Sequence, residues 1–488
     1  MKKANRILSG LLSVSLIAAL SACGGGVAEE TTTTTEFETV TTTVPTVTLN
    51  TTSFLDEEQE AFLNAAEKLP DIELADKEIK WLAHYDAFHP NDAGQPKSPV
   101  LELFEQKYGG EVTFVETTWN ARFDDLSTFV LGAEGLDFFP GDDEASYPKG
   151  VANGMFQPVD DYINLDDPIW DNVRSGMEVN KYGDKHYELV TSINSRFLLS
   201  YSAKTIEENG LEDPYEQWQA GEWNWDTFKA SLLDFVDVEN GMYGLDGWYA
   251  ERGLFVTTGK TMVSVEDGQL VCNINSPEVE KVMLFGEDLF KNNLVKDKAQ
   301  AKYTIQPELM GEGKELFYIG GWYDYTQDPE VWPTKIAPED LRIVPVPCPA
   351  GQETQYTVTR ADGYSLLKGA SNPEGVVAFT YCQIIADADE GLKAVAKRQY
   401  NEDFQLSDEI IAVNDAINQI ARDNPCIEYA AGVSDDVQRA TTDGGEDIGI
   451  RSTFHGHDWA TIRESTADDI ITQVEDVNKK LQEVLAAD

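Results

Sequence analysis

The chain has 488 residues, and its 37 Lys plus Arg against 87 Asp plus Glu give a formal net charge of −50 at pH 7. Carboxylates in such excess repel phosphate backbones, so we expect no nucleic-acid partner. The 10 Trp, 19 Tyr and 21 Phe supply enough apolar material for one large core or two linked cores.

The N-terminal residues predict export and lipidation. Three basic residues precede an apolar stretch at 7–20, which is too short for a permanent membrane-spanning helix. The tetrapeptide Leu-Ser-Ala-Cys that ends at Cys23 resembles the lipobox of bacterial lipoproteins, in which the thiol is joined to diacylglycerol. We therefore expect a signal peptide at 1–22 and a lipid anchor on Cys23; the alternative is an ordinary signal peptide followed by a chance cysteine.

A polar spacer follows the cysteine. Residues 23–53 are rich in Thr and Gly and hold almost no large apolar side chain, so they predict a flexible linker between the membrane and the folded part. Residues 54–76 are expected to add an N-terminal helical extension, with an amphipathic helix at 55–69.

Strand-like and helix-like segments then alternate. The expected strands are 78–85, 111–117 and 136–139, and the expected helices are 99–108 and 122–131. This alternation predicts an α/β fold with a mostly parallel sheet. Ligands collect at the carboxyl ends of such strands, so the loops after Tyr85, Thr117 and Phe139 are the first places to look for a site.

Helix signals continue toward the C-terminus. The segments Asn-Ser-Pro-Glu at 275–278 and Ser-Asn-Pro-Glu at 371–374 each combine a polar cap with a Pro in the first turn, and a long final helix is expected at about 467–485.

Cysteine and histidine are sparse in the mature chain. Four cysteines beyond Cys23 have no metal-ligand spacing and are expected to be buried thiols, although an exported protein permits one disulfide of undetermined pairing: Cys272, Cys348, Cys382 and Cys426. His455 and His457 would need acidic partners to bind a metal, and we expect neither a metal nor a cofactor.

The order of several loose motifs resembles the family 1 extracellular solute-binding proteins, which include maltose-binding protein. The matching segments are IKWLAHY, LFEQKYGGEVTFVE, GMFQPVDDYI, the stretch at 197–228, the NSPE helix, ELFYIGGWYDY, LRIVPVPCPAG, GYSLLKGASNPEGVVAF and HDWATIRES. No single motif is specific, but their order is kept over some 400 residues from residue 77 onward.

The resemblance implies a two-lobed, type II periplasmic-binding-protein-like α/β fold with the ligand cleft between the lobes. It places the first lobe at 77–193 and 341–400, and the second at 194–340 and 401–488. It also implies a monomeric receptor without enzymatic activity, held outside the cell by its lipid. The receptor would capture a small solute, a mono- or oligosaccharide, and deliver it to an ABC permease in the membrane.

Polar candidates for the ligand site follow from the resemblance and from position. Asp142 lies just past the strand ending at Phe139, where sugar-binding relatives place an Asp; the neighbouring Asp143 is an alternative, as is a solvated loop carboxylate. Asn194 and Arg196 lie on the implied first crossing between lobes. Asp362 precedes a glycine at a strand start, where turn chemistry is the competing explanation.

Aromatic candidates are those that could stack on the apolar face of a sugar ring. Trp322 corresponds to a stacking Trp of the relatives, and so does Trp459, although both could instead pack in the core. The weaker candidates are Trp119 after the second strand, Trp248 and Tyr249 in a glycine-flanked loop, and Tyr85 or His89 in the long first loop. Trp223 and Trp225 are expected to be structural, beside a helix start.

Two other classes stay open at this level. A glycoside hydrolase needs only a suitably spaced pair of carboxylates, and an acidic chain offers many. A surface adhesin would bind polysaccharide without feeding a transporter, and the Thr-rich linker suits it as well. Among solutes, peptides, polyols and polyamines also fit a two-lobed receptor.

Overall fold

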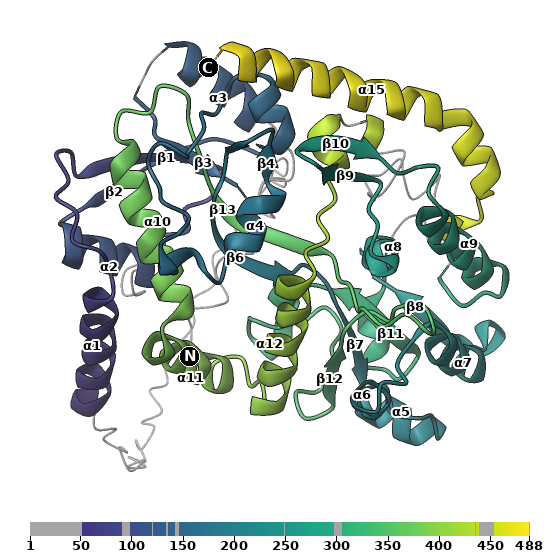
Figure 1. Cartoon of the computed structure of the whole chain (residues 1–488). Coiled ribbons are helices and arrows are strands. Elements are labelled where there is room, and N and C mark those ends of the chain that lie inside the picture. Colours follow the sequence, from purple (N-terminus) through teal and green to yellow (C-terminus); the bar gives the residue numbers. More distant parts are fainter. Residues whose placement is uncertain are drawn as a thin grey trace, which may run out of the picture.

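Two separate sheets form the centres of two α/β lobes in the computed structural model (Figure 1). The structure describes residues 51–89, 98–119, 121–132, 135–141, 146–247, 249–296, 305–434, 436–438 and 453–487. The sheet of the first lobe has the strand order β2-β1-β3-β13-β6, and the sheet of the second lobe has the order β12-β7-β11-β8.

The first sheet mixes parallel and antiparallel pairs. Its strands are β1 (Glu78–Ala83), β2 (Glu111–Glu116), β3 (Phe138–Pro140), β6 (Leu189–Ser195) and β13 (Thr359–Leu366). The first three strands are parallel, as the alternation of segments predicts, whereas β13 runs antiparallel to both β3 and β6. This antiparallel half consists of strands that enter and leave the lobe.

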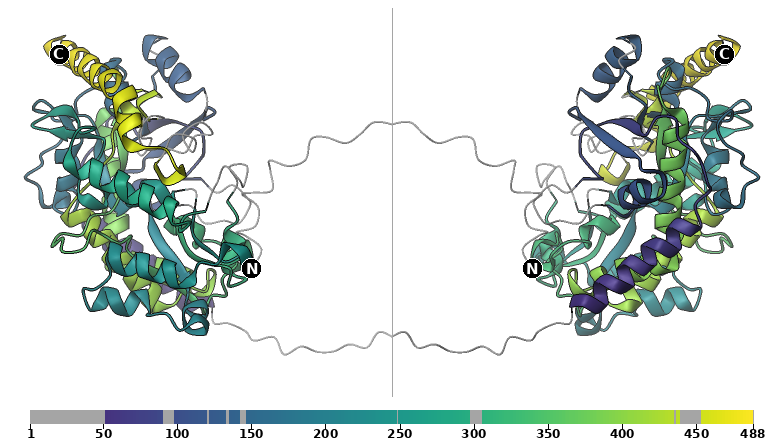
Figure 2. Two further views of the ribbon diagram at one scale, coloured as in Figure 1. Left: turned by 90° about the vertical axis from the view of Figure 1, so that its right-hand side faces the viewer. Right: turned by 90° about the vertical axis from the view of Figure 1, so that its left-hand side faces the viewer.

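Helices cover the first sheet. They are α1 (Thr51–Glu67), α2 (Pro99–Tyr108), α3 (Arg122–Gly132), α4 (Arg174–Val179), α10 (Pro373–Ala388) and α11 (Glu390–Glu402). The sequence predicted α1, α2, α3 and α10, but not α4 or α11. Helix α1 lies against α11 on the first lobe (Figure 2). Lys68, just after α1, donates to Asp389 at 2.6 Å between α10 and α11, which ties the extension to the lobe. The Oδ1 atom of Asn372 caps α10 by accepting from the Gly375 N–H at 2.9 Å, as its motif predicts.

The second lobe is built on a shorter mixed sheet. Its strands are β7 (Leu198–Ser202), β8 (Tyr243–Asp246), β11 (Glu315–Gly320) and β12 (Leu341–Val344). Its helices are α5 (Ala203–Asn209), α6 (Pro214–Gln219), α7 (Trp225–Phe235), α8 (Ala250–Phe255) and α9 (Pro277–Lys291). Asn224 caps α7 and Ser276 caps α9, so both predicted helix starts are confirmed.

The chain passes between the lobes at several points. β6 continues into β7 through Arg196 and Phe197, and residues 345–358 return the chain from β12 to β13. The expected boundary at 341 is therefore too early, because Leu341–Val344 pairs with β7 and belongs to the second sheet. Loose sequence motifs cannot tell which of two neighbouring sheets a short apolar strand joins.

The C-terminal segments also depart from the expected division at 401–488. Helix α12 (Asp408–Asp423) packs against β6 and β13 of the first sheet and β12 of the second. Helix α15 (Trp459–Ala487) begins beside α9 and runs across both lobes (Figure 1). Its Asn478 pairs with Leu270 of the second lobe and accepts, through its carbonyl, from Tyr182 of the first lobe at 3.1 Å.

Cys272, Cys348, Cys382 and Cys426 are free thiols, and all but Cys272 are buried. Burial raises the pKa of the Cys348 thiol to about 11, so it stays protonated at neutral pH. Among the described residues, no helix combines the length and the apolarity needed to cross a bilayer.

Candidate ligand-binding site between the lobes

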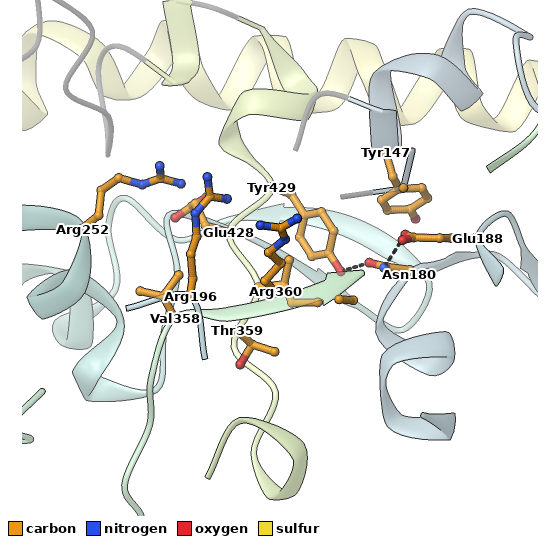
Figure 3. Close-up of a pocket in the computed structure, with 13 residues that line it drawn as sticks. Tyr147, Asn180, Glu188, Arg196, Arg252, Val358, Thr359, Arg360, Glu428 and Tyr429 are labelled. Atoms are coloured by element: carbon orange, nitrogen blue, oxygen red, sulfur yellow. Dashed lines mark hydrogen bonds between the residues drawn. The ribbon is translucent and has the colours of Figure 1, made fainter. Parts of the chain in front are cut away.

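A cavity lies where the two lobes and their connecting segments meet (Figure 3). The space between its lining residues, with the open solvent at its mouth included, is about 490 Å³. The described lining comprises Gly141, Tyr147, Asn180, Glu188, Arg196, Arg252, Val358, Thr359, Arg360, Ala361, Ile427, Glu428 and Tyr429.

The carboxyl ends of the parallel strands lead to this cavity. β1 pairs in parallel with β2 and with β3, so the three strands end along one edge of the sheet. Gly141 follows β3 directly and lines the cavity. A Cβ atom at Gly141 would lie 2.2 Å from Oε1 of Glu188, so a larger residue here would require the Glu188 side chain to move.

A chain of hydrogen bonds forms the first-lobe wall. The Tyr429 hydroxyl donates to Asn180 at 2.6 Å, and the Asn180 amide donates to Oε2 of Glu188 at 2.7 Å (Figure 3). The ring of Tyr147 meets that of Tyr429 edge-on at 5.5 Å. Burial raises the pKa of both tyrosines, so they remain hydroxyl donors. This wall is rigid and polar.

The floor is the ribbon of β6 and β13 where the chain crosses between lobes. Asn194 stands opposite Arg360 in register, and Ser192 stands opposite Asp362. Arg360 forms an ion pair with Asp362, which also accepts from the Ser192 hydroxyl at 3.3 Å. The Asn194 amide donates to Ser192 at 3.0 Å. With Arg196 in the lining, the structure brings three predicted residues together: Asn194, Arg196 and Asp362.

The second-lobe wall combines an arginine with aromatic rings. Phe197 and Tyr249 stack with centroids 4.5 Å apart and planes 17° apart. The guanidinium carbons of Arg196 and Arg252 lie 5.6 and 5.5 Å from the Phe197 ring. Tyr323 shares a side-chain hydrogen bond with Tyr249 and is 52% exposed. Predicted Tyr249 is therefore part of this wall, and Tyr323 is an aromatic that the sequence did not single out.

Trp322 lies next to Tyr323, directly beyond β11. Its half-buried indole meets the Tyr400 ring of α11 edge-on at 5.9 Å and shares a hydrogen bond with the Tyr400 hydroxyl. The contact places Trp322 where a second-lobe loop touches a helix packed on the first lobe. It is not among the residues lining the cavity itself.

Tyr85 and Trp119 follow β1 and β2 and expose their rings. Tyr85 is 42% exposed and Trp119 is 54% exposed. His84 contacts both rings edge-on, at 4.7 and 5.0 Å, and the guanidinium carbon of Arg122 lies 3.7 Å above the Trp119 ring. These two predicted aromatics therefore form a separate exposed cluster at the carboxyl edge of the first sheet.

Trp459 lies in the core. Its side chain is 1% exposed, and its backbone N–H donates to Glu287 of α9 at 2.7 Å. As the first residue of α15, its ring points into the second lobe and away from solvent. Trp223 and Trp225 are likewise buried, as expected, and Trp225 stacks on Phe285 at 4.2 Å.

Three predicted residues, Cys23, Asp142 and Trp248, lie outside the described residues, as does Asp143. His455 is described and its Nε2 pairs with Glu251 at 2.8 Å. Within the described ranges, no group of three or more His, Cys, Asp or Glu is arranged to hold a metal.

The sequence did not single out several lining residues, above all Arg252, Arg360, Glu188 and Glu428. The strand alternation of the segment Thr-Arg-Ala-Asp at 359–362 could have flagged Arg360 beside Asp362 on one face. Arg252 has no such local signal, because it reaches the cavity only through the placement of α8.

The cavity is electrostatically unusual. Burial, with smaller contributions from Arg252 and Arg360, lowers the pKa of Arg196 to about 10. Burial also raises the pKa of Glu428 to about 7, although its carboxylate accepts from the N–H groups of Met262 and Val263 at 2.7 and 2.9 Å. Three arginines thus border the cavity beside a buried carboxyl group whose pKa is raised.

Two α/β lobes joined by crossing strands around a polar cavity define a two-lobed binding protein. Residues 90–380 match the family of bacterial extracellular solute-binding proteins, and the chain belongs to this family. The match favours a solute-binding role over the adhesin and the hydrolase. No curated protein sequence matches the chain.

Solved structures with the same fold carry sugars. The chain is 16% identical to a cyclo/maltodextrin-binding protein complexed with maltotetraose, with TM-score 0.54 over 84% of this chain and 98% of that one. It is 16% identical to an ABC substrate-binding protein from Listeria monocytogenes in complex with cycloalternan, with TM-score 0.52 over 84% and 99%. An extracellular solute-binding protein from Staphylococcus aureus in complex with maltose is 14% identical, with TM-score 0.53 over 84% and 98%.

Proposed function

We propose that the protein captures a mono- or oligosaccharide between its lobes and hands it to a membrane permease of an ABC importer. The observation that carries this proposal is the cavity to which both lobes and the crossing strands contribute side chains. The sugars bound by the three similar structures support a saccharide as the solute.

The chemistry of the walls suits a sugar. A pyranose presents an apolar face and a rim of hydroxyls, which require aromatic rings and paired donors and acceptors. Tyr249 and Tyr323 supply rings beside the cavity, while Asn194, Asp362 and Asn180 supply polar groups. Trp322, Tyr85 and Trp119 are proposed to extend the stacking surface to further sugar units, and Asp142 to add a hydrogen bond from the loop after β3.

Binding would act through lobe closure. A solute that contacts both walls interacts better with a closed arrangement than with an open one, and this difference in affinity shifts the population toward closure. The closed form would then dock on the permease, and no covalent step is involved.

The anchor and the location belong to the same proposal. Cys23 would carry the lipid after removal of residues 1–22, and residues 23–53 would tether a monomeric receptor at the outer face of the cell membrane.

A ligand screen tests the function. The purified full chain is heated with neutral and acidic mono- and oligosaccharides, polyols, amino acids and short peptides, and hits are measured by calorimetry. A micromolar ligand at millimolar concentration should stabilise the fold by roughly 4 kcal/mol. A saccharide that does so and is recovered unchanged supports the proposal. If no saccharide shifts the transition, or if the hit is consumed, the proposal fails.

A further inference from the structure

Three arginine side chains meet at the cavity from three different elements. Arg196 follows β6, Arg252 lies on α8 of the second lobe, and Arg360 belongs to β13. Figure 3 shows the guanidinium groups of Arg196 and Arg360 pointing the same way from the floor, with Arg252 reaching toward them. The lobes and the crossing strands thus all deliver arginine to one place.

The cluster is held by packing as well as by charge. Arg196 and Arg252 lie over the same Phe197 ring, at 5.6 and 5.5 Å, and the ring is stacked on Tyr249. Arg360 is oriented by its ion pair with Asp362. The guanidinium groups are therefore fixed in position before any ligand arrives, which reduces the entropy lost on binding.

The composition of the lining contrasts with that of the chain. Three of the thirteen described lining residues are basic, against 37 of 488 in the whole sequence, which is about a threefold enrichment. Acidic residues occur in this lining at about the average of the chain. A net charge of −50 repels an anionic solute at long range, so a receptor for such a solute needs a local concentration of positive charge in its cleft.

The two glutamates of the described lining have structural partners. Glu428 accepts from the backbone N–H groups of Met262, Val263 and Ala430, which fix the segment after α12. Glu188 accepts from Asn180 in the first-lobe wall. Each of these carboxylates thus has a role in holding the walls. Asp362 beside the lining pairs with Arg360, so the three arginines are distinguished by their convergence on one cavity and not by an excess over carboxylates.

We propose that the solute is an acidic saccharide, whose carboxylate, phosphate or sulfate group is bound by Arg196, Arg252 and Arg360. Guanidinium forks match the paired oxygens of these anions and bind them more strongly than neutral hydroxyls. The sugar ring lies against Tyr249 and Tyr323. This inference rests on the proposed function and specifies the class of its solute.

Calorimetry on the full chain with matched saccharides tests the proposal. The probes are galacturonate and glucuronate oligosaccharides, the neutral galactose and glucose oligosaccharides of the same length, and the corresponding sugar phosphates and sulfates. We expect one acidic class to bind at least 100-fold more tightly than its neutral counterpart. Comparison of the carboxylate, phosphate and sulfate probes then identifies the anion. Tighter binding of the neutral sugars overturns this inference but keeps the proposed function. Binding of neither set overturns both.

Variants test whether the arginines cause the selectivity for acidic saccharides. Arg252→Gln should weaken binding of the acidic saccharide at least tenfold and reduce its advantage over the neutral one. Arg463→Gln removes the same charge from a surface ion pair with Glu280 on α9 and should leave both affinities unchanged. An Arg252→Gln protein that loses acidic and neutral binding in equal proportion would show a structural role and overturn the assignment.

Discussion

Two buried charge clusters of the second lobe differ in what surrounds them. Inside the lobe, Lys296 lies 3.2 Å from Asp246 and 3.7 Å from Glu315, with all three side chains almost fully buried. Burial and the charge of Asp246 raise the pKa of Glu315 well above its usual range. At the cavity, by contrast, arginines from three different elements border an open space, and one of them, Arg360, pairs with Asp362. Charges enclosed within a lobe serve the fold, whereas charges that border a cavity can also contact a ligand.

Two tryptophans also differ in whether they lie inside a lobe or at an accessible surface. Trp459 is 1% exposed within the core of the second lobe, whereas Trp322 is half-buried at a loop that touches α11. The family resemblance suggested a sugar-stacking role for both tryptophans. Only the structure around each ring shows that Trp459 packs in the core and that Trp322 is accessible.

Replacing Lys296 with Met should strongly destabilise the fold. It leaves the Asp246 carboxylate buried without its cation, so we expect the free energy of unfolding to fall by about 3 kcal/mol in urea denaturation. Ligand affinity of the folded protein should not change. Lys314→Met is the control, because its pair with Glu312 is half exposed and should contribute less than ~1 kcal/mol. Equal losses of stability in the two variants would show that the buried Lys296 pair contributes no more than an exposed ion pair.

Trp322→Ala should weaken ligand binding and leave the stability of the fold almost unchanged, which is the opposite of Lys296→Met. We expect saccharide affinity to fall at least tenfold in calorimetry, because a stacking ring is lost, with little change in thermal stability. Trp459→Ala should instead destabilise the fold by about 3–5 kcal/mol, since it empties a core site. Unchanged affinity in Trp322→Ala would exclude this ring from the binding site.

The stability of the fold should also depend on pH. The pKa of Glu428 is raised to about 7 and that of Asp324 to about 6, in both cases mainly by burial. A carboxyl group with a raised folded-state pKa stabilises the fold fully below its unfolded pKa, and this contribution disappears as pH rises through the folded value. From pH 5 to pH 8 the free energy of unfolding should therefore fall, by at most about 1.4 kcal/mol per pH unit for each group.

Urea denaturation at pH 5, 6, 7 and 8 measures this dependence, and Glu428→Gln should flatten it. Stability that rises steadily from pH 5 to pH 8 in the unaltered protein would contradict the burial of these carboxyl groups.

Local signals in the sequence predicted part of the fold. Periodicity and caps predicted the parallel strands β1, β2 and β3 and the helices that Ser276 and Asn372 begin, because these depend on neighbouring residues alone. The antiparallel pairing of β13 and the joining of β12 to the second sheet depend on distant partners and could not be predicted in this way.

The site was predicted only in part, for a similar reason. Asn194, Arg196, Tyr249 and Asp362 meet near the cavity as residues of the crossing segments or loops. Arg252 has no local signal, and Arg360 has only the strand alternation that places it on the same face as Asp362. Both residues reach the cavity only because α8 and β13 are brought together, and no single sequence motif contains them both.

The most direct test of the account is a distance between the lobes with and without solute. Nitroxide labels at Leu131→Cys on α3 and Leu284→Cys on α9 use positions that are 86% and 50% exposed on opposite lobes. Cys23 and the partly exposed Cys272 are replaced with Ser in this protein, while Cys348, Cys382 and Cys426 are buried. Electron–electron double resonance should show a shorter distance between the labels when the saccharide found in the screen is saturating. An unchanged distance with the solute bound would contradict capture by closure between the lobes.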